Sequence, residues 1–523
     1  MMTKAGVIPL KQFQGPDAEI SDDIVIGKDI LDLLTGAMYV DPLSIYREYI
    51  QNSADAIQEA RETGLYSTAK PAWIKIHVDP KARSVTVLDN GIGVPQKDFV
   101  RRLTAIGASR KRGADLRGFR GVGRLSGLGY CQELVFRSRA DGDRKVSELT
   151  WDGKKLKDLL RSDSQIELTE AIKSIAKTRV VSAEGRPEHF FEVELRSLGR
   201  VHNDVLLNDG EIHSYLSQVA PVPFSPDFRF SEAIADFLPQ YTKYDTVDIT
   251  LGPSGKIFRP HSDQFPITDK VSDTFSGITF FQVPGMEDDI DAVGWLLTHS
   301  YLGAISKRAH VEGLRARVGN IQIGTADVFD SLFTQPRFNS WCVGEVHVLS
   351  KRILPNGRRD NFEVNGHLQN LHGHLAKTAK DLIKICRDKS VIRNRLKSAA
   401  LLVESAHQSI SLLEQNNFSA LKQYFEAFSS KVLGQLDQLV RSSSLSEAER
   451  ALVASRCKVL ADRLRLTSRN GARRRDPLAK IGTVKRRAYE EAIDAVLTAT
   501  LPISVRADLT QRIIRRATSK SIT

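Results

Sequence analysis

The sequence predicts an α+β architecture in three parts: a domain of helices and strands, a second α/β domain, and an α-helical C-terminal region. Apolar residues recur at helical spacing in "YREYIQNSADAI" (46–57), and they alternate with polar residues in segments such as "AWIKIHV" (72–78). From residue 361 onward, leucines at helical spacing replace this alternation. A chain of 523 residues is also too long for one hydrophobic core, so several domains are expected.

The expected boundaries follow these changes in pattern along the chain. Residues 1–20 resemble a loose leader, residues 21–205 form the first domain, residues 206–360 the second, and residues 361–523 the helical region. In the first domain we expect helices over 29–39 and from 46 to about 62, and strands over 72–78, 84–90, 131–139 and 189–197. In the second domain we expect strands over 246–252, 277–283, 314–324 and 344–350.

The composition is that of a globular protein in water. Hydrophobic residues make up 41% of the chain and charged residues 26%. No apolar run approaches the roughly 20 residues of a membrane-spanning helix, and "MMTKAGVIPLKQFQG" lacks the apolar stretch of a secretory signal. The four cysteines are scattered and form no metal-binding pair, so we expect free thiols, a cytoplasmic location and no membrane partner.

Positive charge is concentrated in the C-terminal third. The formal net charge is +12, and residues 361–523 carry 29 lysines and arginines against 15 aspartates and glutamates. Such a basic surface suits a nucleic acid or another polyanion. A solvated helical surface would have the same composition, and both interpretations stay open.

The helix expected from residue 46 carries a polar face. Glu48, Asn52 and Asp55 are spaced so that they share one side of the helix. This face could simply be solvated. It could also do chemistry, because an asparagine can give Mg²⁺ a carbonyl oxygen and a nearby carboxylate can accept a proton from water that attacks a phosphate. Asp55 could hold a water molecule or a cation of a lid.

Two glycine-containing stretches downstream favour the chemical interpretation. The chain has no G-x-x-x-x-G-K-[ST] phosphate loop. In "VLDNGIGVP" (87–95), Asp89 ends a strand, and a buried carboxylate there suits the exocyclic amine of adenine. Gly91 and Gly93 allow the backbone to approach a ligand closely. A D-N-G turn without a ligand is the alternative.

The second stretch is "LRGFRGVGRLSGLG" (116–129), which precedes a helix expected from Arg124. Free backbone N–H groups at a glycine-rich helix start bind phosphate. The stretch follows a helix and a hairpin, whereas a dinucleotide-binding fold places its glycines directly after the first strand. With "IGASRKRG" (106–113) before it, the segment could form a basic lid over a phosphate or a flexible basic loop.

These three elements, in this order, resemble the GHKL ATPases, which include gyrase, the 90-kDa heat-shock chaperones, histidine kinases and MutL. "ILDLLTGAMYVDPLSIYREYIQNSADAI" (30–57) is similar to the first block of the chaperones, and "LDNGIGV" and "GFRGVGRLSG" resemble their adenine and lid motifs. The lid also has MutL-like features, and the resemblance covers about residues 24–200. It implies a Bergerat-type α/β sandwich followed by a transducer domain of the ribosomal-S5 type.

The resemblance implies an ATP site with Mg²⁺. Glu48 would be the general base, Asn52 the magnesium ligand and Asp89 the adenine-binding residue, with Gly93 and Val94 beside the base. The other residues implied at the site are Asp55, Gly91, Ser109, Lys111, Gly118, Phe119, Gly121, Val122 and Gly123.

Two features lie outside these motifs. The family usually has a Gly-Thr pair before its last strand, but "HFFEVEL" (189–195) has none, and Thr178 or Ser182 could replace it. "ILPNGRRDNFE" (353–363) resembles the chaperone segment that carries an arginine for the γ-phosphate, which would be Arg359. The competing cations are Arg358, Lys307 and Arg317.

The resemblance therefore implies an ATP-hydrolysing clamp with ATP-dependent N-terminal dimerisation. The leucine-rich C-terminal helices, which lie outside the resemblance, indicate dimerisation there as well, so a homodimer is expected. One hypothesis is a chaperone-like machine that acts on client proteins. The alternative is a DNA-associated clamp of the MutL or MORC type in repair or defence, suggested by "GFRG" and the basic tail. A histidine kinase is disfavoured because His77, the first histidine, lies in an expected strand.

Overall fold

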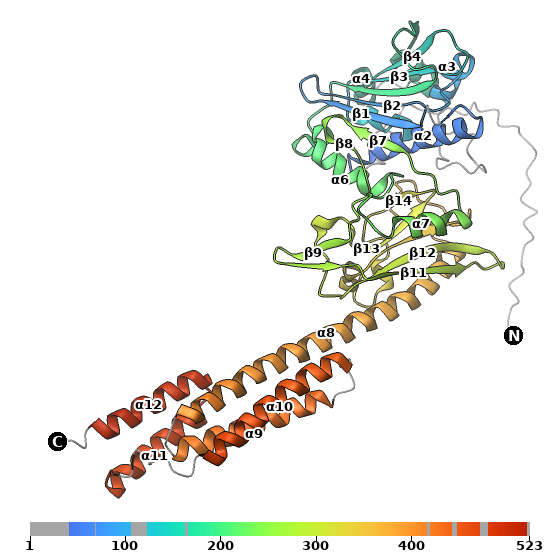
Figure 1. The fold of residues 1–523 in the computed structure, drawn as a ribbon. Coiled ribbons are helices and arrows are strands. Elements are labelled where there is room, and N and C mark those ends of the chain that lie inside the picture. The colour runs from blue at the N-terminus through green and yellow to red at the C-terminus, as the bar shows by residue number, and fades with distance from the viewer. Residues whose placement is uncertain are drawn as a thin grey trace, which may run out of the picture. The chain divides into compact units, whose positions relative to one another are not determined.

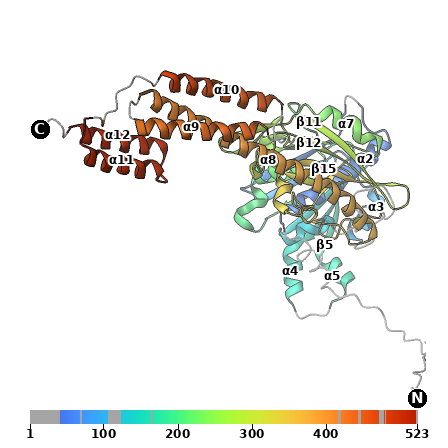
Figure 2. The same ribbon diagram turned by 90° about the horizontal axis from the view of Figure 1, so that it is seen from below.

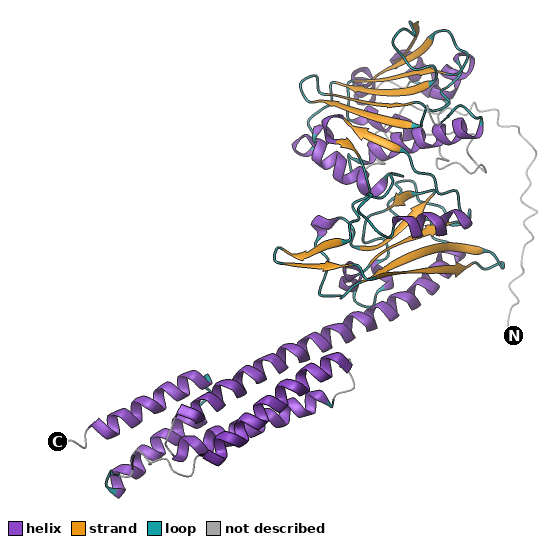
Figure 3. Cartoon of the chain, viewed as in Figure 1, coloured by secondary structure: helices purple, strands orange, loops and turns teal. Residues whose placement is uncertain are grey.

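The computed structural model describes residues 41–67, 70–105, 123–162, 166–415, 419–441, 447–470, 478 and 480–519. The chain divides into two compact units, one of Met1–His299 with Ala304–Ala379 and one of Ser300–Gly303 with Lys380–Thr523. The named strands belong to the first unit, and helices make up the second (Figure 3). The helix expected over 29–39 lies outside the described residues.

An eight-stranded sheet forms the N-terminal domain, in the order β5-β4-β3-β6-β2-β1-β7-β8. Neighbouring strands are antiparallel except β1 and β7, which are parallel. The four strands expected here correspond to β1, β2, β3 and β6, so these predictions are confirmed. The strands are β1 (Trp73–Asp79), β2 (Ser84–Asp89), β3 (Glu133–Arg139), β4 (Val146–Asp152), β5 (Ala176–Val181), β6 (Phe190–Arg196), β7 (Asp248–Leu251) and β8 (Gly255–Lys256).

Helix α2 (Ser44–Glu62) lies along this sheet (Figure 1). Its apolar stripe, which includes Tyr46, Tyr49 and Ile50, is buried in the same core as the sheet, as the helical spacing predicts. A sheet with helices packed on it is the α/β sandwich that the sequence predicts. The domain's other helices are α3 (Gln96–Thr104), the 3₁₀ helix η3 (Gly123–Gly129), α4 (Gly153–Arg161), α5 (Leu168–Ile175) and α6 (Asp209–Val219), of which α4 and α5 lie side by side (Figure 2).

The core of this domain continues beyond residue 205, where the sequence analysis places the boundary. Trp73 of β1 pairs with Asp248 of β7, and Ile212 of α6 and Ile257 belong to the same buried cluster as the sheet. The reason is that β7 hydrogen-bonds alongside β1 and extends the sheet at that edge. A local pattern cannot reveal a pairing between segments so far apart in the sequence.

The second domain contains a five-stranded mixed sheet in the order β11-β12-β15-β13-β14. All of its strands are antiparallel to their neighbours except β13 and β15, which are parallel. Aromatic residues such as Phe228, Phe275 and Trp295 fill a separate core on this sheet. The elements are α7 (Ser231–Phe237), β9 (Gln264–Thr268), β10 (Val271–Thr274), β11 (Gly277–Pro284), β12 (Ile290–Thr298), the 3₁₀ helix η7 (Lys307–Ala309), β13 (Gly313–Val318), β14 (Ile321–Ile323) and β15 (Val343–Val348).

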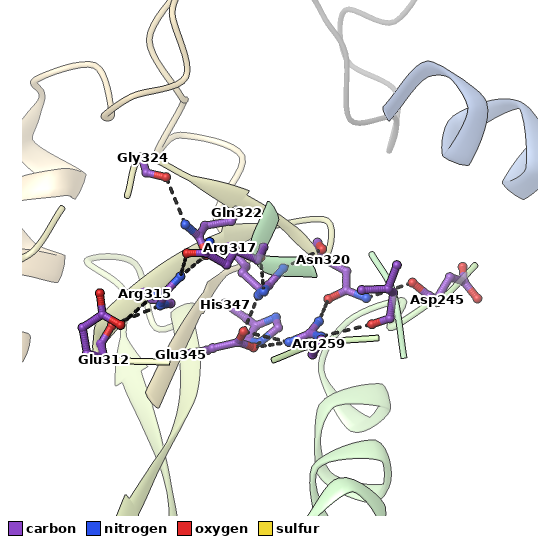
Figure 4. A network of polar contacts seen from close by, with 12 residues as sticks. Asp245, Arg259, Glu312, Arg315, Arg317, Asn320, Gln322, Gly324, Glu345 and His347 are labelled. Carbon is purple, nitrogen blue, oxygen red and sulfur yellow. Dashed lines mark hydrogen bonds and ion pairs between the residues drawn. The ribbon is translucent and has the colours of Figure 1, made fainter. Parts of the chain in front are cut away.

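A buried ion network crosses this sheet (Figure 4). Glu345 of β15 accepts hydrogen bonds from Arg259, at 2.7 Å to each carboxylate oxygen, and from Arg317 of β13. Burial acts to raise the pKa of Glu345, but the two guanidinium groups hold it well below its usual range. Arg317 also donates to the carbonyl oxygen of Gln218 in α6, 2.7 Å away, so the network ties the second domain to a helix of the first.

The C-terminal unit is helical, as the sequence predicts. Its core is aliphatic and includes Ile410, Leu436, Leu460 and Ile493. Among the described residues, no helix is long and apolar enough to cross a membrane. The four cysteines are free, and Cys457 is the one that is partly exposed. The helices are α8 (Gly366–Gln415), which begins in the first unit, α9 (Ser419–Val440), α10 (Glu447–Asn470), α11 (Thr483–Thr498) and α12 (Ile503–Ser519).

Candidate functional site

Asp89 lies buried at the end of β2. Its carboxylate accepts hydrogen bonds from the Ser53 hydroxyl at 2.6 Å and from the Gly91 backbone N–H at 2.8 Å. Burial raises the pKa of Asp89 to about 6, although these donors oppose the shift. The group is therefore ionised at neutral pH and can accept a hydrogen bond from a ligand's amine.

The loop after Asp89 requires its glycines. A side chain at Gly91 would place Cβ 2.7 Å from Cβ of Ala56, on helix α2. Gly93 has a φ of +70°, and a Cβ there would lie 2.1 Å from the backbone oxygen of Arg139. The backbone N–H of Val94 donates to the Ser138 hydroxyl at 2.8 Å. The loop is thus held tightly against α2 and β3.

The polar face of α2 is not a solvated surface. Glu48 is 6% exposed and Asp55 1% exposed, whereas Asn52 is half-buried. Burying carboxylates costs free energy unless they have partners or a ligand. Helix α2 therefore carries two buried carboxylates and a half-buried amide on this face.

The end of the lid motif meets Glu48. A Cβ added at Gly123 would lie 2.0 Å from Glu48 Oε2, so any larger residue here requires this carboxylate to move. The helical segment expected from Arg124 is the 3₁₀ helix η3, and the Tyr49 hydroxyl accepts a 3.0 Å hydrogen bond from the Gly127 N–H within it. The other predicted lid residues, Ser109, Lys111, Gly118, Phe119, Gly121 and Val122, lie outside the described residues.

Arg359 of the second domain reaches the same carboxylate. Its Nε lies 3.2 Å from Glu48 Oε1. The loop that carries Arg359 is held in place by Arg47 of α2, which donates to the carbonyl oxygens of Arg358 at 2.9 Å and Arg359 at 3.3 Å. Arg359 itself has a φ of +57°, in the left-handed region that a non-glycine residue seldom adopts.

The competing cations do not share this position. Arg317 is 1% exposed and is bound to Glu345 in the buried network, so the interpretation of Arg317 as a phosphate contact is wrong. Lys307 is exposed on η7, and the Arg358 side chain is exposed although its carbonyl oxygen accepts from Arg47. Of these four residues, Arg359 is the one that forms an ion pair with Glu48. This ion pair joins the second domain to α2.

The expected substitutes for the family's Gly-Thr pair do not lie near Asp89. Phe191 of β6 is the residue paired with Asp89 in the sheet, and its side chain has no hydrogen-bonding group. Thr178 lies in β5 and Ser182 directly follows it, and β4, β3 and β6 separate β5 from β2. Three intervening strands place β5 roughly 19 Å from β2, so neither hydroxyl replaces the missing threonine.

Four contacts of the site escaped the sequence analysis. Ser53 and Ser138 hold the Asp89 loop, His189 Nδ1 lies 2.8 Å from the carbonyl oxygen of Gly91, and Arg47 holds the Arg359 loop. A helical wheel places Ser53 on the sheet side of α2, which is the one signal that could have indicated its role. The other contacts depend on strand register and on the second domain.

The geometry and a family comparison agree on the class of this domain. Residues 44–180 match the family described as histidine kinase-, DNA gyrase B-, and HSP90-like ATPase. Together with the buried Asp89 loop and the polar face of α2, this match shows that residues 44–180 are similar to the ATP-binding domains of the GHKL superfamily.

Proteins similar to this chain include chaperones. The chain is 31% identical over 144 residues to the chaperone protein HtpG of Polaromonas naphthalenivorans, with 23% of each chain covered. It is 29% identical over 141 residues to HtpG of Halorhodospira halophila, covering 24% of this chain and 22% of that protein, and 24% identical over 164 residues to HtpG of Klebsiella pneumoniae, covering 27% and 26%. The likeness thus spans about a quarter of either protein.

Proposed function

We propose that the protein binds ATP at the Asp89 site and hydrolyses it. The observation that supports this most directly is the convergence on Glu48 of Gly123, from the end of the lid motif, and Arg359, from the second domain. Asp89 would accept a hydrogen bond from the exocyclic amine of adenine, and Gly93 would let the backbone approach the base.

In this mechanism a water molecule attacks the γ-phosphorus in line with the bond to the β-phosphate. The Glu48 carboxylate accepts the proton of the attacking water, and the bridging oxygen leaves on ADP with the electron pair of the broken bond. The Arg359 guanidinium would stabilise the charge that develops on the γ-phosphate oxygens. It would also transmit the presence of ATP to the second domain.

Asn52 fits the magnesium ion that such a reaction employs. Its amide oxygen is the hard oxygen donor that Mg²⁺ prefers, and the residue is half-buried one helical turn from Glu48. When bound, Mg²⁺ would neutralise phosphate charge. Asp55 is buried on the same helix and has a polar partner of its own, so a structural role beside the site is proposed for it.

The test of this function separates binding from hydrolysis. We expect Glu48→Ala to abolish phosphate release while the protein still binds ATP, because the proton acceptor is lost and Asp89 is unchanged. Glu59→Ala, which changes a glutamate elsewhere on α2, is the matched control and should leave the rate unchanged. Unchanged turnover in Glu48→Ala would exclude Glu48 as the general base.

We further propose that two copies associate through the C-terminal helices to form a clamp. Leu452, Val459 and Leu466 recur every seven residues on α10 and are 54%, 67% and 63% exposed. A stripe of large apolar side chains in water favours association. Val459→Lys should therefore lower the mass measured by light scattering, and Leu401→Lys, at an exposed position of α8, should not. Equal masses for the two variants would argue against this surface.

The similarity to HtpG chaperones favours a client protein as the substrate of such a clamp. Suppressed aggregation of a model client, dependent on ATP, would support it. The basic excess of residues 361–523 favours a second candidate, a nucleic acid. If duplex DNA binds, its affinity should fall steeply between low and moderate salt, and this fall should lessen when Arg473, Arg474 and Arg475 are neutralised.

A further inference from the structure

A second pocket lies away from the nucleotide site, between helix α6 and the strands and loops of the second domain. Its volume is about 440 Å³, which is within the range of small-molecule sites. Helix α6 contributes His213, Ser214 and Ser217, while the segments around β8, β9 and η7 form the remaining walls. Both sets of residues belong to the first compact unit.

The charge of the pocket has one sign. Of the described residues that line it, none is an aspartate or a glutamate, and five are basic. The Arg259 guanidinium donates hydrogen bonds to both carboxylate oxygens of Glu345, so its charge is already neutralised within the protein. Lys256, Arg308, His213 and His310 are therefore the basic groups that a ligand could meet.

The two long cations are only weakly engaged by the protein. Lys256 forms an ion pair with Asp248 at 2.7 Å. Arg308 forms an ion pair with Asp269 at 3.2 Å, and the side chains of Arg308 and Asp269 are both more than 80% exposed. Ion pairs so open to water contribute about 0–1 kcal/mol. Either side chain can therefore exchange its partner for an anion in the pocket at little cost.

The two histidines are arranged differently. The Ser214 hydroxyl lies 3.1 Å from His310 Nε2, which fixes the His310 ring against α6. His310 follows η7 with a φ of +55°, so the backbone turns there and leaves the ring facing the helix. His213, one residue before Ser214, lines the pocket from the same helix.

The remaining walls are largely apolar, with Ser217, Ser262 and Gln264 as further polar residues. Phe258, Phe265, Pro260, Pro266 and Val311 line the pocket beside the basic groups. A free inorganic ion would leave these walls facing water, whereas a molecule with an apolar body would cover them. We propose that this pocket binds a small organic anion, whose carboxylate or phosphate meets Lys256 and Arg308 and whose apolar body packs on the phenylalanines and prolines.

The test uses the full-length protein with phenyl phosphate and benzoate as probes and benzyl alcohol as the uncharged comparison. We expect both anions to bind at millimolar concentrations in calorimetry, to raise the melting temperature by mass action, and to bind more weakly as salt is added. Benzyl alcohol should bind at least tenfold more weakly. The two anions together determine whether the pocket distinguishes a phosphate from a carboxylate.

Variants locate the binding. Lys256→Ala and Arg308→Ala should each lower the affinity for the two anions by about tenfold, since each variant loses one charge-assisted contact. Both residues are exposed, so folding should be unaffected, and Lys270→Ala, an exposed lysine that does not line the pocket, is the matched control.

The probes could also enter the phosphate region of the nucleotide site, so the same titration is repeated with Asp89→Asn and with saturating ADP. Binding that persists under both conditions and is lost in Lys256→Ala and Arg308→Ala supports the proposal. Absence of binding at millimolar probe, or equal affinities for Lys256→Ala, Arg308→Ala and Lys270→Ala, would overturn it. The proposal does not depend on ATP hydrolysis, because Glu48→Ala should bind the probes like the unaltered protein.

Discussion

The guanidinium Nε of Arg359 lies 3.2 Å from Glu48 Oε1, although the two residues are more than 300 positions apart in the chain and belong to different domains. Both side chains are largely buried, at 15% and 8% exposure. Arg47 of α2 holds the backbone of the Arg359 loop from the same helix turn. The second domain therefore contributes a cation directly to the polar face of α2.

The first prediction concerns this cation. Arg359→Ala should lower kcat for ATP hydrolysis by about 100-fold or more, because a charge aimed at the transition state is lost. Arg358→Ala is the matched control: its side chain is exposed, and the contact it makes with Arg47 is through its backbone, so the rate should be unchanged. Equal rates for the two variants would refute the role of Arg359.

The second prediction concerns the contact between the lid motif and Glu48. Gly123→Ala would place Cβ 2.0 Å from Glu48 Oε2, so the carboxylate must move aside. Because a displacement of about 1 Å can cost roughly 100-fold in rate, hydrolysis should fall sharply while the melting temperature changes little. Gly373→Ala, where a Cβ meets nothing within 4 Å, is the control. A full rate in Gly123→Ala would contradict the close contact.

The third prediction links Asp89 to stability. Its pKa of about 6 in the folded protein lies above the usual 3.8, so the folded state binds more protons between these values and stability falls as pH rises through them. At pH 7 the buried charge costs up to about 3 kcal/mol. Asp89→Asn should therefore be more stable than the unaltered protein at pH 7, and the difference should vanish near pH 4.

Nucleotide binding supplies the second half of this test. Asp89→Asn should lose ATP binding, because an amide cannot accept from both the protein donors and the adenine amine. In the unaltered protein ATP affinity should decline as pH drops below about 6. Denaturant unfolding measures the stability, and calorimetry measures the affinity for ATP. If Asp89→Asn is less stable than the unaltered protein at pH 7 and still binds ATP, Asp89 is not a buried, ligand-binding carboxylate.

The fourth prediction concerns the buried network of the second domain. Glu345→Gln should lower the free energy of unfolding by about 3–5 kcal/mol, because Arg259 and Arg317 would remain buried without their countercharge. Glu287→Gln breaks an ion pair with Arg352 on the exposed surface and should cost less than about 1 kcal/mol. Similar losses for both variants would show that the network does not carry this stability.

Much of the site was predictable because its signals are local. Asp89 was indicated because it ends a strand and is the first residue of D-N-G-x-G, and the spacing of Glu48, Asn52 and Asp55 indicated one face of α2. The segment "GRRD" identified Arg359 through a resemblance, since no local pattern connects it to α2.

What the sequence could not supply depends on register and on contacts between distant segments. The residue opposite Asp89 is Phe191 only because β6 pairs with β2 in that register. Arg317 is basic and in the right domain, but its ion pair with Glu345 on the adjacent strand β15 makes it a structural residue. Likewise, nothing in residues 246–252 reveals that this strand pairs with β1 rather than within its own domain.

That pairing of β7 with β1 has a consequence for synthesis on the ribosome. The N-terminal sheet cannot be completed when β6 has emerged at Arg196, because β7 and the buried Ile257 are still to be translated. At roughly 5–20 residues per second, the nascent chain waits about 3–12 s with the edge of β1 uncovered. During this interval the unpaired edge of β1 is open to pairing with other chains.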